Sequence, residues 1–168
     1  MKIEIKYGVI IGVLLALWNL TEYAFGFHSK HIEIHAIVTN FFIIIPIIFL
    51  ILGIREKRDK ELKGELSYWQ GVKTGLLISL VTAVLAVIFL YLYHNYINPY
   101  FFSDMIEYTT SKAARENPNN PEAIELARTA AVNYFTLTSY LIQGFFGSII
   151  FGTVISLVVP AVLRRKKS

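Results

Sequence analysis

Residues 41–52 read FFIIIPIIFLIL, a run that carries no charge and does not alternate between polar and apolar side chains. A strand of a membrane barrel would alternate, so the run favours a helix. Backbone groups cannot be left unpaired in hydrocarbon, and a helix satisfies them within one segment. The run is therefore typical of a transmembrane helix.

The rest of the chain contains three further apolar runs of this kind. Each reaches the roughly 20 residues that a helix needs to cross a hydrocarbon layer of about 30 Å. The chain of 168 residues is 55% hydrophobic and 17% charged, whereas soluble proteins average about 25% charged residues. The excess apolar surface must face lipid. We predict an all-α integral membrane protein, a single membrane domain of four transmembrane helices, with spans at about 7–27, 34–54, 72–97 and 134–163.

The distribution of basic residues predicts how the chain is oriented. Twelve of the sixteen Lys and Arg residues lie in the N-terminal stub, around the loop 55–71 and in the C-terminal tail. Positive charge concentrates on the cytoplasmic side, so both termini and this loop are predicted to be cytoplasmic, with the bilayer and not nucleic acid as the basic residues' partner. A cleaved signal peptide is the alternative for the first run, although that run exceeds the usual 7–15 apolar residues.

The polar segment 98–133 is too long for a bare loop. Asn98-Pro99 ends the third span, and the residues that follow it have near-helical apolar spacing. Asn117–Pro121 is typical of a turn, with Asn120 as helix cap and Pro121 as the first helical residue. We predict an extracytoplasmic amphipathic helical hairpin resting on the membrane surface, whose second helix continues unbroken into the last span.

Small residues recur at every fourth position in three of the spans, where they allow two helix backbones to approach closely. Two interpretations remain open. The ridges pack within one bundle, or one of them, above all the ridge of the last span, faces a second copy or another membrane protein. The helix-packing residues are Gly8, Gly12, Gly71, Gly75, Gly144, Ser148, Gly152 and Ser156.

Glu22 is the most informative polar residue because it lies within the first apolar run. An ionised carboxylate in hydrocarbon is costly, so it must protonate or find a partner. Residues at similar estimated depth on other spans could form an outward polar pocket with it, or an interhelical hydrogen-bond cluster that only fixes how the helices mate. The candidates are Glu22, Asn19, Asn40, Gln143, Tyr140 and His94.

Histidines gather near the first outer loop. His31 and His35 are four residues apart, which would place them on one helix face, and His28 precedes them. Imidazole ligands suit zinc and similar divalent ions. We therefore consider His28, His31 and His35 as a metal site, against the alternative that they are interfacial residues without a ligand.

Several kinds of chemistry have no support in the sequence. The chain has no cysteine, which excludes disulfides and thiolate metal sites. It lacks the phosphate-binding loop, the dinucleotide glycine pattern and the hydrolase and metalloprotease motifs. We expect no enzyme and no cofactor.

Four motifs resemble a known family: Lys6-Tyr7-Gly8, Glu22-Tyr23, the segment 68–75 (YWQGVKTG) and the segment 96–107 (YINPYFFSDMIE). The resemblance is to small bacterial inner-membrane proteins catalogued as domain of unknown function four-one-nine-nine. It implies four spans and the bacterial cytoplasmic membrane, and it brings no activity.

These observations favour a non-enzymatic membrane scaffold or accessory protein that packs, and in one interpretation oligomerises, through its small-residue ridges. Two alternatives remain. One is a small transporter or channel component that works through the polar pocket around Glu22. The other is an outward-facing sensor or metal binder.

Overall fold

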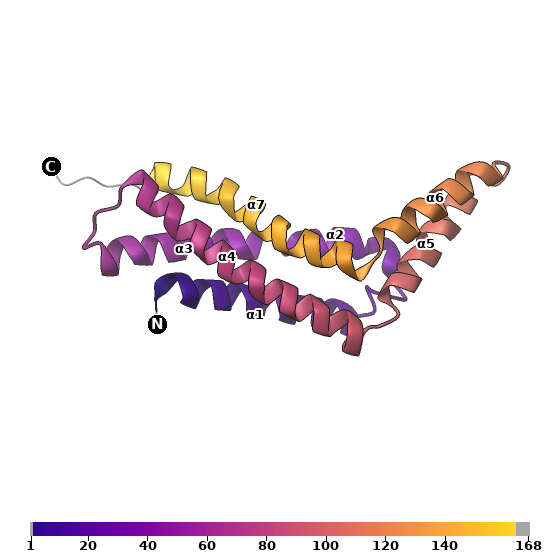
Figure 1. The fold of residues 1–168 in the computed structure, drawn as a ribbon, viewed down its shortest axis with the longest axis horizontal. Coiled ribbons are helices and arrows are strands. Elements are labelled where there is room, and N and C mark those ends of the chain that lie inside the picture. The colour runs from indigo at the N-terminus through magenta and orange to yellow at the C-terminus, as the bar shows by residue number, and fades with distance from the viewer. Residues whose placement is uncertain (1, 164–168) are drawn as a thin grey trace.

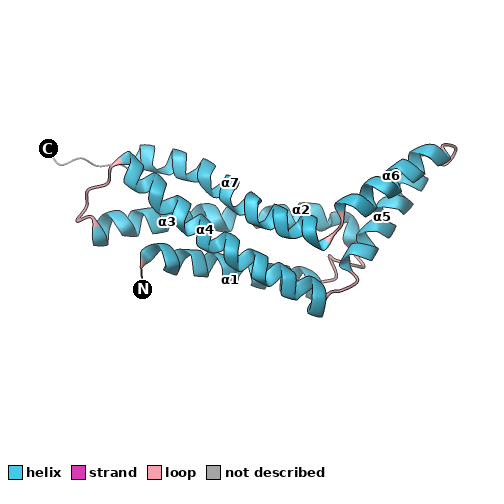
Figure 2. Cartoon of the chain, in the orientation of Figure 1, coloured by secondary structure: helices cyan, strands magenta, loops and turns pink. Residues whose placement is uncertain are grey.

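The computed structural model describes residues 2–163 (Figure 1). Every regular element in this range is a helix (Figure 2), so the predicted all-α class is confirmed. In chain order the helices are α1 Ile3–Ala24, η1 Ile32–Ile34, α2 His35–Phe41, α3 Ile44–Glu56, η2 Lys57–Glu61, α4 Tyr68–Leu92, η3 Tyr93–Ile97, α5 Phe101–Glu116, α6 Pro121–Tyr134 and α7 Leu137–Leu163.

Four helical segments of the described chain are long and apolar enough to cross a membrane: Ile3–Ala24, Ile32–Glu61, Tyr68–Ile97 and Leu137–Leu163. They run side by side as an elongated bundle (Figure 1). Large apolar side chains point away from it, with exposed fractions of 61% for Phe41, 63% for Ile150 and 81% for Val162. Such a surface is stable against hydrocarbon and unstable against water.

Both ends of the chain lie at one end of the bundle, and α5 and α6 project from the other (Figure 1). This is the arrangement that an even number of crossings produces. Which end faces the cytoplasm stays a prediction. The basic tail at 164–167, which contributed to that prediction, lies outside the described residues.

The end that carries the termini is held by ion pairs between the first two spans. Glu56 of α3 accepts hydrogen bonds from Lys6 Nζ and the Tyr7 hydroxyl, both at 2.7 Å. Lys57 Nζ lies 2.8 Å from a carboxylate oxygen of Glu4. The charged segment after the second span therefore also clamps the start of α1.

The small-residue ridges pack against neighbouring helices of the same chain. On α1, a Cβ added to Gly8 would lie 2.5 Å from Val81 Cβ, and one added to Gly12 would lie 2.9 Å from Leu85 Cβ, so α1 is pressed against α4. The ridge of α1 thus packs within one bundle, which is the first of the two interpretations.

The contact between α4 and α7 is equally close. Added Cβ atoms would lie 2.7 Å from Ser156 Cβ at Gly75, 2.5 Å from Ser79 Cβ at Gly152 and 2.6 Å from Pro160 Cβ at Gly71. Gly144 likewise meets Leu90 of α4, while the Ser148 hydroxyl donates to the Gly144 carbonyl. The α7 ridge that could have faced a second copy is therefore covered by α4 at Gly152 and Ser156.

The second span is broken between α2 and α3. Pro46 has no N–H to donate to the Phe42 carbonyl, and its ring would collide with that carbonyl in a regular helix. The chain responds with a tighter turn in which Phe42 N donates to Thr39 O at 3.1 Å and Ile43 N donates to Asn40 O at 3.2 Å. The break separates α2, which carries part of the candidate site, from the straight α3.

The segment between the last two spans forms α5 and α6, which lie side by side (Figure 1). The prediction for the start of α6 is confirmed, because Asn120 accepts a hydrogen bond from Ala123 N and Pro121 opens the helix. The prediction of an unbroken helix into the last span is wrong. Thr136 lies between α6 and α7, and its Oγ1 accepts from Ser139 N at 3.2 Å as a helix cap would.

We predict that Ser67→Ala destabilises the start of α4 by about 1 kcal/mol, because it removes one half of a capping box. Ser67 Oγ accepts from Gln70 N at 3.3 Å, and Gln70 Oε1 accepts from Ser67 N at 2.9 Å. Unfolding in mixed detergent–dodecyl sulfate micelles, followed by circular dichroism, measures the loss. Ser111→Ala, at an exposed position of α5, is the matched control and should have little effect.

Candidate functional site

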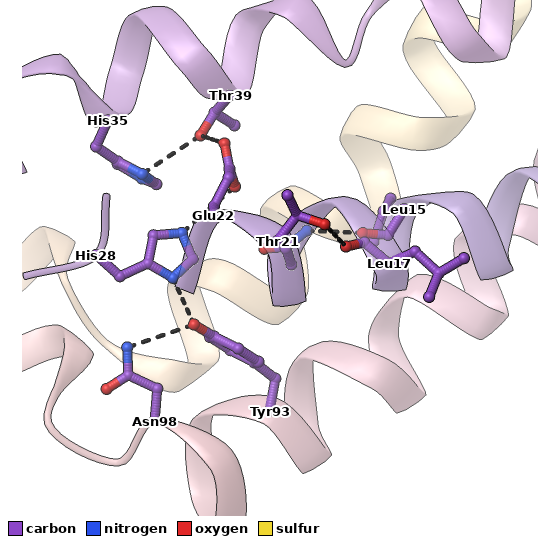
Figure 3. Close-up of polar contacts among 10 residues, drawn as sticks. Leu15, Leu17, Thr21, Glu22, His28, His35, Thr39, Tyr93 and Asn98 are labelled. Atoms are coloured by element: carbon purple, nitrogen blue, oxygen red, sulfur yellow. Dashed lines mark hydrogen bonds and ion pairs between the residues drawn. The ribbon is translucent and has the colours of Figure 1, made fainter. Parts of the chain in front are cut away.

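Glu22, near the C-terminal end of α1, is the centre of a buried polar cluster (Figure 3). Its side chain is almost fully buried, with 1% of the residue exposed. Thr39 of α2 donates its hydroxyl to Glu22 Oε1 at 2.6 Å, and His28 Nε2 lies 3.3 Å from Glu22 Oε2. Both carboxylate oxygens therefore have a partner inside the protein, which offsets part of the cost of burying them.

His28 reaches this position because the chain reverses directly after α1. Gly26 adopts a positive φ of 76°, which glycine tolerates at no steric cost, and its carbonyl accepts from the backbone N–H groups of Ser29 and His31. The turn buries His28 to 2% exposure. Its second ring nitrogen, Nδ1, is hydrogen-bonded to the hydroxyl of Tyr93.

His35, at the start of α2, completes the cluster. Its ring centroid lies 4.7 Å from that of His28, and its Nδ1 lies 3.4 Å from Thr39 Oγ1. One ligand atom from each of Glu22, His28 and His35 lies within 4.8 Å of the other two, and they form the metal-compatible group found in the described residues. Two imidazoles and a carboxylate are ligands that zinc and its neighbours accept.

The side chains of the cluster are held by hydrogen bonds to residues further out. Thr39 orients the carboxylate, and the Tyr93 hydroxyl orients the imidazole of His28. The Tyr93 hydroxyl in turn accepts from Asn98 Nδ2 at 3.4 Å. Such outer partners fix the tautomer and the ring plane of a metal-binding histidine. The same groups form a hydrogen-bonded chain that runs from Tyr93 through His28 to Glu22.

Aromatic rings from α5 and α7 cover the cluster. Phe101, which is 2% exposed, places its ring centroid 5.1 Å from His28 and 5.7 Å from His35. Beside it, the ring centroid of His94 lies 4.5 Å from that of Phe102 and 5.4 Å from that of Tyr140, which it meets edge-on. This cover lowers the local dielectric and strengthens the polar contacts beneath it.

The structure joins only two of the three predicted metal-site histidines. His31 is exposed, and its ring centroid lies 6.3 Å from that of Phe27 instead of joining the cluster. The expected pairing of His31 with His35 assumed one continuous helix, but His31 precedes the 3₁₀ turn η1 and has φ −120° and ψ 37°. Sequence reasoning placed Glu22 in a separate pocket and missed Tyr93 as a supporting residue of the cluster.

The predicted polar-pocket residues separate into two groups. Asn19, His94, Tyr140 and Gln143 line one cavity of about 290 Å³, together with His28 and His35. Asn40 and Gln143 line an adjoining cavity of about 490 Å³. Glu22 is among the lining residues of neither cavity, because Thr39 and His28 cover its carboxylate.

The amides in this region bond to their surroundings and not to Glu22. Asn19 Nδ2 donates to Leu15 O at 3.0 Å, and Asn40 Nδ2 donates to Ala36 O at 2.7 Å, each within its own helix. Gln143 Oε1 accepts from the Tyr134 hydroxyl at 2.9 Å. These amides line space that Glu22 does not enter.

A family model described as "Protein of unknown function (DUF4199)" matches residues 6–165. No curated protein and no solved structure matches the chain.

Proposed function

We propose that this chain, which belongs to the family described as protein of unknown function (DUF4199), is a multi-pass membrane protein that binds a divalent transition-metal ion through Glu22, His28 and His35. The observation that carries the proposal is the convergence of one ligand atom from each residue within 4.8 Å. Glu22 and His28 are 1% and 2% exposed. Ligands this deeply buried are already stripped of competing water.

The chemistry of the cluster supports a borderline metal such as Zn²⁺. Nitrogen and carboxylate ligands disfavour Ca²⁺ and Mg²⁺, which prefer all-oxygen sites, and they suit zinc, cobalt and nickel. Three protein ligands leave a fourth tetrahedral position open. His28 and His35 line the cavity of about 290 Å³, so that position can be reached from it.

The side of the membrane on which the proposed site lies suggests what the site would respond to. The basic-residue bias supports an orientation with both termini in the cytoplasm, and in that orientation the cluster lies at the extracytoplasmic end. The bacterial cytoplasmic membrane is what the family resemblance implies. A non-enzymatic accessory or sensor protein would then respond to metal outside the cell. The predicted scaffold role agrees with this proposal, because metal binding at the junction of α1, α2 and η3 would stiffen the end of the bundle that carries α5 and α6.

A transport route through Glu22 receives less support. A carboxylate that relays ions should line the permeation space, whereas the Glu22 oxygens are bonded to Thr39 and His28. The remaining alternative is a hydrogen-bond cluster that only ties the helices together. It predicts no metal affinity, and the next experiment separates the two.

Metal-free protein in detergent should bind one Zn²⁺ or Co²⁺ per chain, measured by titration calorimetry and by the visible absorption of tetrahedral Co²⁺. Glu22→Gln and His35→Ala each remove a ligand, and we expect at least about tenfold weaker binding. His31→Ala is the matched control, since it removes a nearby histidine outside the cluster, and it should bind like the parent. Equal uptake by all four proteins, or none by the parent, would contradict the proposal.

A further inference from the structure

A second potential site lies beside the metal cluster, in the two adjoining cavities. The cavity of about 290 Å³ and that of about 490 Å³ adjoin each other, and both are lined by Leu15, Thr39, Phe42, Gln143 and Ser148. The larger part extends along the bundle, where it is lined by apolar residues that include Ile11, Pro46, Leu50 and Phe151.

The smaller part contains polar atoms that the protein leaves unpaired. Trp18 Nε1 and His94 Nδ1 are both buried and have no hydrogen-bond partner among the described residues, and both residues line this cavity. His94 is only 6% exposed. Leaving buried polar groups unpaired costs free energy, so both atoms point to a bound partner. An indole N–H can only donate, and the partner must therefore offer an acceptor to Trp18.

The lining also restricts the charge and shape of that partner. Among residues 2–163, no Lys, Arg, Asp or Glu lines the smaller cavity. This disfavours a phosphate or another ionised head group, because none of these residues would neutralise it. Aromatic rings dominate the walls, and these include Trp18, Phe42, His94, Phe101 and Tyr140. A flat, uncharged head stacks well against such rings.

We propose that the adjoining cavities bind an isoprenoid quinone drawn from the bilayer. Its ring occupies the smaller cavity, where the Trp18 and His94 N–H groups donate to its carbonyl oxygens. Its chain extends into the larger, apolar cavity among helices whose outer faces contact hydrocarbon. The proposal concerns binding alone and does not depend on metal at Glu22, His28 and His35.

Trp18 itself can report the binding. The chain has two tryptophans, and the other, Trp69, is 71% exposed at the start of α4. In a Trp69→Phe background, a decyl-substituted benzoquinone should quench Trp18 fluorescence saturably at one site per chain, in detergent with chelator present. Dodecanol, which has a similar chain and a hydroxyl head, should not displace it at equal concentration.

Two variants test the head and chain contacts separately. His94→Phe keeps a ring but removes the hydrogen bond and should weaken quinone binding about tenfold. Gly147→Leu adds a side chain beside the larger cavity, where an added Cβ meets nothing within 4 Å, and should also weaken it. His31→Phe is the control, with parental affinity expected. Non-saturating quenching that is identical in every variant would overturn the proposal, as would displacement of the quinone by dodecanol at equal concentration.

Discussion

Glu22→Ala is expected to lower the free energy of unfolding by about 3 kcal/mol or more, even in metal-free protein. The substitution leaves the Thr39 hydroxyl and the His28 ring nitrogen without their acceptor. Breaking a buried charged contact by removing one partner costs about 3–5 kcal/mol. The loss also releases α1 from α2 and from the Tyr93 hydroxyl, which holds His28 from the other side.

The neighbouring residue provides a matched control for this prediction. Thr21 is exposed, and its hydroxyl donates to Leu17 O of its own helix at 2.8 Å (Figure 3). Thr21→Ala should therefore change stability by less than about 0.5 kcal/mol. Glu22→Gln should lie between the two variants, because its amide oxygen can still accept from Thr39.

Reversible unfolding in mixed detergent–dodecyl sulfate micelles, with chelator present, gives the three free energies. If Glu22→Ala and Thr21→Ala unfold at the same dodecyl sulfate fraction, the cluster does not hold the helices together. If Glu22→Gln instead unfolds as readily as Glu22→Ala, it loses its use as a metal-site variant of normal fold. The measurement thus also establishes whether the metal titrations compare folded proteins.

The apolar runs and the importance of Glu22 were both predictable from sequence, for the same physical reason. Hydrocarbon demands long uncharged helices, and it makes a carboxylate inside one of them conspicuous. The contacts that bring His28 to Glu22 and Tyr93 to His28 were not predictable. His28 depends on the reversal at Gly26, and Tyr93 is brought in from a helix far along the chain. No periodicity within one helix carries that information.

Helix packing, too, was predictable only in part from the sequence. Small residues at every fourth position indicate a close helix contact, but they do not say which helix makes it. From the sequence, Gly152 and Ser156 could face either a second copy or α4. Their contacts with Ser79 and Gly75 identify α4 as the neighbour. The break between α2 and α3 could be anticipated from Pro46, whereas the end of α6 at Tyr134 depends on the cap that Thr136 provides.

Gly152→Ala is expected to destabilise the bundle by about 2–3 kcal/mol, which is a large effect for one added methyl group. The new Cβ would lie 2.5 Å from Ser79 Cβ and closer still to the Ser79 hydroxyl. Ser79 Cβ is fixed to the α4 backbone and cannot rotate away, so α4 and α7 must separate. Overpacking of a well-packed interior costs about 1–3 kcal/mol, and here the strain falls on a close helix contact.

A control substitution on the same helix should not lower the stability of the bundle. Gly147, five residues earlier on α7, has nothing within 4 Å of an added Cβ. Gly147→Ala should leave stability unchanged or raise it by up to about 1 kcal/mol, because alanine favours the helix. Thermal denaturation of both variants in the same detergent, followed by circular dichroism, should therefore move the two melting temperatures in opposite directions or move only that of Gly152→Ala.

The double variant Gly152→Ala/Ser79→Gly decides the mechanism. It removes the atoms with which the new methyl group collides and restores a small residue facing an alanine across the α4–α7 contact. If the clash is the cause, the double variant should be at least 1 kcal/mol more stable than the sum of the two single effects predicts, well beyond the roughly 0.3–0.5 kcal/mol within which independent sites add. Strict additivity would mean that Gly152 stabilises the protein in some other way and that α4 is not its packing partner.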